Sequence, residues 1–195
     1  MSAWIKMVSP EDATGRLKEL YDRVTTPHGT VDNVMRAHSL RPETLDGHVV
    51  LYKSVLHNED NTLPFWFLEA IATYVSLTNR CHYSTTHHAA NMRRLQDDET
   101  RAETMYAALA CDQPELVFEG KELALLRYAR KLTAAVGEMC ATDIETLRAA
   151  GANDGEILEV NQVCAYFNYS NRLLNGLGVT TKGDTVGYYK KDGQE

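Results

Sequence analysis

The sequence lacks the features that mark a membrane or secreted protein. Its longest apolar run, residues 63–68, ends at Glu69, far short of the roughly 20 residues that a helix needs to cross a bilayer. Residues 1–10 carry Lys6 inside their only apolar stretch and are followed by an acidic pair, a pattern unlike a secretory signal. We therefore expect a cytoplasmic protein that makes no contact with a membrane.

Cysteine pairs and an excess of positive charge are also missing. The four cysteines stand far apart with no Cys-x-x-Cys spacing, which argues against a zinc ribbon or a disulfide framework. The chain has 20 lysine and arginine residues against 27 aspartate and glutamate residues, a net charge of −7. Because such a chain repels phosphate backbones, nucleic acid is not an expected partner.

Apolar residues do recur at helical spacing along nearly the whole chain. Ser9 followed by proline predicts the start of a first helix. Thr142 and Glu145 have the spacing of a capping box, and Asn153 precedes a long final helix. We find no alternating strand pattern, no linker and no strong repeat, and 195 residues suffice to bury one core. The sequence therefore predicts an all-α, single-domain protein.

Residues able to carry out chemistry concentrate between Glu69 and His88. Glu69 interrupts the most apolar predicted helix, where burial raises the pKa of a carboxyl group. Cys81 follows Arg80 at a predicted helix start, where free backbone amides and a guanidinium favour a thiolate. Ser84 and His88 fall on the same helical face as Cys81. We expect the thiol, the hydroxyl and the imidazole to share one pocket.

Structural roles compete with these interpretations. Glu69 can also mark a helix boundary that faces solvent or pairs with an arginine. Cys81 alone is compatible with a small buried apolar side chain, and we interpret Cys111, Cys140 and Cys164 in that way.

The histidines near the thiol suggest two further sites, neither of which we expect. His82, His87 and His88 are close to Cys81 in sequence, but His82 points away from the helical face of the other ligands, so no metal site is predicted. Ser84 with His88 and a glutamate resembles a hydrolase triad, yet no Gly-x-Ser-x-Gly elbow surrounds the serine.

Taken together, Glu69, Cys81, Ser84 and His88 resemble the core motif of the alkyl hydroperoxidase D and carboxymuconolactone decarboxylase superfamily, Glu-x11-Cys-x-x-Cys-x-x-x-His. Residues 142–157 and 167–179 are similar to the C-terminal helices of its peroxidase-related branch. The resemblance implies an alkyl hydroperoxidase D-like helical core over residues 41–179, a helical extension over 1–40 and a polar tail over 180–195. It also implies a homo-oligomer, as a trimer, hexamer or dimer, without a cofactor or metal.

In the peroxidase members of this superfamily, the second motif cysteine attacks the peroxide and the first resolves it as a disulfide, while the glutamate and the histidine relay protons. By position, Glu69 matches the glutamate, Cys81 the first cysteine and His88 the histidine. Ser84 replaces the attacking cysteine, and a serine hydroxyl forms neither a sulfenic acid nor a disulfide. Tyr83 also replaces the histidine that precedes that cysteine in the best-known peroxidases.

Three functions are compatible with this departure. The main prediction is an antioxidant peroxidase in which Cys81 alone reduces peroxides, Glu69 and His88 relay protons, Ser84 hydrogen-bonds the thiolate, and an external thiol is the reductant. This mechanism requires Cys81 to face a pocket. The second is proton transfer by Glu69 and His88 on a small carbonyl acid or lactone, as in the decarboxylase branch. The third is a non-catalytic oligomer that binds a ligand or senses thiols.

Overall fold

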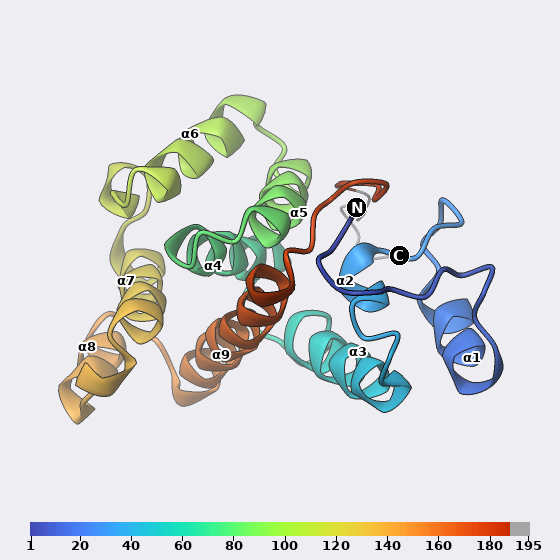
Figure 1. The fold of residues 1–195 in the computed structure, drawn as a ribbon. Helices are drawn as coiled ribbons and strands as arrows, with labels where there is room; N and C mark the ends of the chain where they lie inside the picture. The colour runs from blue at the N-terminus through green and yellow to red at the C-terminus, as the bar shows by residue number, and fades with distance from the viewer. Residues whose placement is uncertain (188–195) are drawn as a thin grey trace.

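The computed structural model describes residues 1–187, and the regular structure within them is entirely helical, as predicted (Figure 1). The α-helices in chain order are α1 (Gly15–Val24), α2 (Asn33–Arg36), α3 (Pro42–Leu56), α4 (Phe65–Thr78), α5 (His82–Arg94), α6 (Glu99–Ala110), α7 (Gly120–Ala134), α8 (Ala141–Ala149) and α9 (Asp154–Leu177). Two short 3₁₀ turns, η1 (Pro114–Leu116) and η2 (Val136–Glu138), flank α7. Residues 188–195 of the predicted tail lie outside the described residues.

The ends of α9 form as the sequence predicts. The Asn153 side chain accepts a hydrogen bond from the Glu156 amide, and the Glu156 carboxylate accepts one from the Asn153 amide. These two bonds satisfy amides that the first helical turn leaves unpaired. At the other end, Gly178 takes the left-handed conformation, with φ of 62°, which terminates the helix.

The predicted start of the first helix is wrong. The Ser9 hydroxyl and the Asp12 carboxylate bond to each other, and the Asp12 amide donates back to Ser9. This local turn uses the capping groups, and α1 begins only at Gly15.

The capping box before α8 is also displaced from its predicted position. Cys140 and Asp143 form it in place of Thr142 and Glu145, so the helix begins two residues earlier than predicted. The Lys131 ammonium group lies 2.7 Å from the Asp143 carboxylate, which holds that side chain at the helix start.

Helix α4 occupies the centre of the core, in contact with α5, α7 and α9 (Figure 1). Its side chains are apolar on nearly every face, and Phe67, Ile71 and Val75 are fully buried. A helix of this kind is stable only when it is covered on all sides. Glu69 belongs to α4, so the fold places this carboxyl group inside the protein.

The N-terminal segment and the start of the tail cover one side of this core. Leu20 and Tyr21 of α1 pack with Leu45 of α3. The Thr180 amide donates to the Ser2 carbonyl, so the first residues and the tail run side by side (Figure 1). Within residues 1–187, no helix combines the length and apolar character needed to span a bilayer.

Candidate active site

Glu69 and His88 form a direct pair across the contact between α4 and α5. His88 Nδ1 lies 2.6 Å from Glu69 Oε2, and the Glu69 side chain is fully buried. Asn91, on the same face of α5, donates its amide to the other carboxylate oxygen at 3.3 Å. The structure thus brings together two residues that the motif places 19 positions apart.

This contact fixes the orientation of the imidazole and places Nδ1 toward the carboxylate. When Nδ1–H donates to the carboxylate, Nε2 carries the free lone pair of the neutral ring. Phe167 packs edge-on against His88, with ring centroids 4.5 Å apart, and restricts its rotation. A buried carboxylate behind an imidazole stabilises the imidazolium that forms when Nε2 accepts a proton. The pair therefore has the geometry of a general base and acid.

Cys81 stands at the turn between these two helices. Arg80 has a φ of 53°, a left-handed conformation that is uncommon outside glycine. The Cys81 amide then donates to the Ser76 carbonyl. This turn reverses the chain direction so that α5 packs along α4 and carries His88 to Glu69.

The Cys81 thiol is buried away from any surface. It has no exposed area and packs in an apolar cluster with Ala3 and Leu174. Burial raises the pKa of the Cys81 thiol, and the amides of Tyr83 and Ser84 with the Ser84 hydroxyl offset part of this effect. The peroxidase prediction requires an accessible thiol, and in this structure Cys81 is not accessible.

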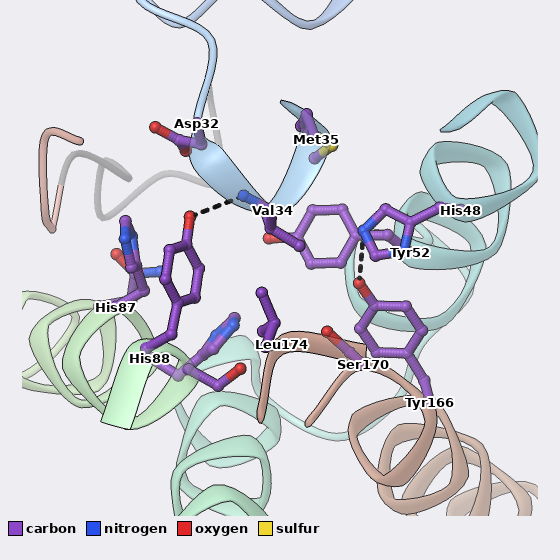
Figure 2. Close-up of a pocket in the computed structure, with 13 residues that line it drawn as sticks. Asp32, Val34, Met35, His48, Tyr52, His87, His88, Tyr166, Ser170 and Leu174 are labelled. Carbon is purple, nitrogen blue, oxygen red and sulfur yellow. Dashed lines mark hydrogen bonds between the residues drawn. The ribbon is translucent and has the colours of Figure 1, made fainter. Parts of the chain in front are cut away.

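A cavity of about 50 Å³ lies between α2, α3, α5 and α9 (Figure 2). Ser84 and His88 line it, whereas Glu69 and Cys81 do not. Much of the remaining wall is apolar and comes from α2 and α9, with Val34, Met35 and Leu174 among its residues. The hydroxyl and the imidazole of the motif therefore face a common cavity, while the carboxyl group supports the imidazole from behind.

The far side of the cavity holds two residues that the sequence analysis missed. His48 of α3 and Tyr166 of α9 line it, and the Tyr166 hydroxyl lies 3.2 Å from His48 Nε2 (Figure 2). Burial, with a smaller effect from His38, lowers the pKa of His48 to about 3, so this ring is neutral at neutral pH. A signal was present, since His48 interrupts the apolar stripe that contains Leu45 and Tyr52.

Asp184 of the tail contacts two residues of the cavity wall, Tyr83 and His87. Its carboxylate accepts hydrogen bonds from the Tyr83 hydroxyl at 2.5 Å and from the Asn33 amide at 3.1 Å, and it lies 3.5 Å from His87 Nε2. The Tyr83 oxygen in turn accepts from the Val34 amide. Tyr83, which stands where the best-known peroxidases have histidine, therefore links α2, α5 and the tail.

The other three cysteines form no disulfide with Cys81 or with one another. All four are free, and Cys111 and Cys140 are exposed, so the prediction that both are buried is wrong. Each ends or begins a helix at the surface. Cys164 is buried as predicted, and burial raises the pKa of its thiol. Among residues 1–187, no three histidine, cysteine, aspartate or glutamate side chains are grouped so that they could hold a metal ion.

Comparison with known proteins identifies the fold. No protein-family model matches the chain, and no curated protein sequence matches it. An uncharacterized peroxidase-related protein from Ralstonia eutropha JMP134, described as an alkylhydroperoxidase AhpD core, superposes with a TM-score of 0.81 at 21% identity and 94% coverage of both chains. A peroxidase-related protein from Silicibacter sp. TM1040 gives 0.77 at 23% identity, covering 94% of this chain and 93% of its own.

The debrominase Bmp8 also shares the fold. Its apo structure superposes with a TM-score of 0.72 at 15% identity, covering 94% of this chain and 92% of its own. A second structure of that protein is a complex with 2,3,4-tribromopyrrole. Proteins described as peroxidase-related and as a debrominase thus share one helical architecture. The chain described here has the alkyl hydroperoxidase D-like fold that its central motif predicts.

Proposed function

We propose that this protein is an acid–base enzyme in which the Glu69–His88 pair transfers a proton to and from a small organic substrate. The observation that carries the proposal is the 2.6 Å contact between His88 Nδ1 and Glu69 Oε2, together with the position of His88 on the cavity wall. The imidazole of His88 lines the cavity, whereas the thiol of Cys81 does not.

The roles of the motif residues follow from this geometry. His88 Nε2 accepts a proton from the substrate, and the Glu69 carboxylate stabilises the resulting imidazolium. Ser84 lines the same cavity, where its hydroxyl donates a hydrogen bond to the bound molecule. The proton then returns from His88 to a second position on the substrate or to the same one.

A one-thiol peroxidase is the second candidate function. Burial raises the pKa of the Cys81 thiol, and the backbone amides and the hydroxyl beside the sulfur offset part of this effect, which favours the thiolate that a nucleophile requires. In that reaction the thiolate attacks one peroxide oxygen, the O–O bond breaks, His88 protonates the leaving oxygen, and an external thiol reduces the sulfenic acid. The buried sulfur makes this function depend on a conformational opening that proton transfer does not need.

Deuterium exchange tests the proton-transfer function even while the product is unidentified. A panel of small ketones, aldehydes and amides is incubated with the protein in deuterium oxide, and loss of the proton signal beside the carbonyl group is followed by NMR. We expect exchange that Glu69→Gln and His88→Gln abolish and that Cys81→Ser leaves intact. Exchange that survives both of the first two substitutions would contradict the proposal.

Peroxide labelling tests the second candidate. The reduced protein is treated with a stoichiometric organic hydroperoxide and a sulfenic-acid trap, and the adduct is located by peptide mass spectrometry with Cys81→Ser as the control. A rapid adduct confined to Cys81 would establish the peroxidase. Ser84→Cys adds a geometric test, because cysteines three residues apart at a helix start can form a disulfide if the pocket retains the family arrangement.

Homo-oligomer formation stays a prediction from the resemblance, and a cytoplasmic location without membrane contact stays a prediction from the sequence. Light scattering coupled to gel filtration measures the oligomeric state directly. Fractionation of cells that express the full chain measures its location.

A further inference from the structure

The cavity has a second polar end opposite His88. There the Tyr166 hydroxyl lies 3.2 Å from His48 Nε2, and Ser170 lines the wall one helical turn after Tyr166 (Figure 2). The His48 side chain is only 3% exposed and the Tyr166 side chain 5%. Burial raises the pKa of the Tyr166 hydroxyl, so it stays protonated at neutral pH.

The hydrogen-bond pattern assigns a direction to this pair. His48 Nδ1 is buried and has no hydrogen-bond partner in the described part of the chain. A buried N–H group without a partner is rarer than a buried acceptor without one. The ring proton therefore resides on Nε2 and is donated to the Tyr166 oxygen. The Tyr166 hydroxyl also interacts with Ser170, and its proton can be donated to a molecule in the cavity.

The charge of the wall restricts what can bind. Neither lysine nor arginine is among the residues that line the cavity in the described chain, whereas Asp32 is one of them. A carboxylate or phosphate group would lose its hydration without gaining a lysine or arginine partner, which is costly. A substrate that is itself an acid, as in the predicted decarboxylase alternative, thus finds no permanently charged counter-ion here and meets the like charge of Asp32.

The size of the cavity restricts the ligand further. Its volume of about 50 Å³ is roughly a third of the ~150 Å³ of a protein cavity that accommodates benzene. A molecule with few non-hydrogen atoms therefore fits within it.

The geometry points to a small neutral carbonyl compound as the substrate, with its oxygen on the Tyr166 hydroxyl and the adjacent carbon toward His88. This inference rests on the proposed proton-transfer function and names its substrate class. His88 Nε2 takes the proton from that carbon, the electron pair of the broken C–H bond moves toward the oxygen, and the Tyr166 hydrogen bond stabilises the enolate. The proton then returns from His88 to carbon, so no oxidant, reductant or metal is consumed.

Two probes of the same shape and different charge test this class. Acetamide is neutral and acetate is anionic, and their binding to the wild-type protein is followed through the imidazole NMR signals of His48 and His88. We expect acetamide to shift both sets of signals and acetate to bind at least about tenfold more weakly, since a desolvated charge without a partner costs more than 1.4 kcal/mol. Acetate that binds as well as acetamide, or acetamide that shifts neither ring, would overturn the inference.

A matched pair of tyrosine variants tests the predicted contact. Tyr166→Phe removes only the hydroxyl, and we expect it to weaken acetamide binding by about tenfold. Tyr106→Phe removes a hydroxyl on α6, away from the cavity, and should leave binding unchanged. Unaltered binding in a folded Tyr166→Phe variant would refute the role of Tyr166, and the comparison of acetamide with acetate decides the substrate class even if that variant does not fold.

The tests of the ligand class and of the proton-transfer function can fail independently of each other. Glu69→Gln should abolish deuterium exchange, whereas acetamide binding is measured on the wild-type protein and does not depend on that variant. If acetamide binds as expected and exchange is insensitive to Glu69→Gln, then the ligand class stands and the proton-transfer function fails. If exchange depends on Glu69 and acetamide does not bind, then the function stands and this inference fails.

Discussion

His88 and His48 reach the same cavity from different helices, α5 and α3, and they have different partners. His88 is backed by the buried carboxylate of Glu69, whereas His48 contacts the Tyr166 hydroxyl and the ring of His38, 4.7 Å away. A carboxylate favours a positive imidazole, and a buried neutral environment opposes one. Side chains of one type at the two ends of a cavity thus differ in their surroundings according to their partners, which are a buried carboxylate for His88 and a hydroxyl for His48.

The largest effect is expected when the carboxylate behind His88 is neutralised. Glu69→Gln keeps the size of the side chain and removes its charge, so the imidazolium loses its stabilisation. We expect the proton-exchange rate to fall by about 10²-fold or more, measured by NMR with the substrate that exchanges fastest. The exposed Glu103, which pairs with Arg93 at the surface, provides the control in Glu103→Gln, and an equal loss in both variants would contradict the assignment.

Burial of the neutral His48 should make the free energy of unfolding depend on pH. The pKa of His48 is about 3 in the folded protein and about 6.5 in an unfolded chain, so the unfolded state binds the extra proton as the pH falls below 6.5. The free energy of unfolding therefore decreases as the pH falls below about 6.5. Between pH 7 and pH 5 we expect wild type to lose about 2 kcal/mol more than His48→Gln, measured by urea unfolding.

An exposed histidine supplies the control for this measurement. His82 lies at the surface at the start of α5, and His82→Gln should show the same pH dependence as wild type. If His48→Gln also follows wild type, then the contrast between the two cavity histidines is wrong.

An effect of similar size on stability is expected at Asp184, which contacts Tyr83 of the cavity wall. Asp184→Asn removes the charge that the Tyr83 hydroxyl and the Asn33 amide contact. Because hydrogen bonds to a buried charged group are stronger than neutral ones, we expect a loss of about 2 kcal/mol in the free energy of unfolding. Asp22→Asn, at an exposed pair with Lys18, should cost at most about 0.5 kcal/mol, and similar losses in the two variants would argue against the tail as part of the wall.

The smallest effect is expected at the motif cysteine. Cys81→Ser should change the proton-exchange rate by less than about twofold, because the sulfur lies outside the cavity. Cys111→Ser, at an exposed thiol, is the matched control. A large loss of exchange in Cys81→Ser but not in Cys111→Ser would show that the reaction depends on the Cys81 sulfur.

Much of the helical framework was predictable because its signals are local. The reciprocal bonds of Asn153 and Glu156 and the left-handed Gly178 depend on residues within a few positions of one another. The errors at Ser9 and Thr142 are local as well, since a neighbouring side chain competed for the same free amides or offered the cap at a different residue.

The candidate site was predictable only along one segment of chain. The motif placed Glu69, Ser84 and His88 together because α4 and α5 are joined by a short turn. His48 and Tyr166 stand 118 positions apart, and no periodicity connects residues at that distance. The sequence also could not decide whether Cys81 is buried, because the residues that cover it, such as Ala3 and Leu174, come from both ends of the chain.

The sequence by itself determined the all-helical class and the ends of the last helix, since these follow from periodicity and local capping. The resemblance of one motif to a known family added the alkyl hydroperoxidase D-like fold. Only the tertiary structure decided which of the motif residues face the cavity. That choice depends on how each helix is rotated about its axis, and the rotation is set by long-range contacts such as those of Phe167 with His88, Leu174 with Cys81 and Asp184 with Tyr83. This packing exposes the imidazole of His88 to the cavity, buries the thiol of Cys81 and brings a neutral histidine to the opposite wall.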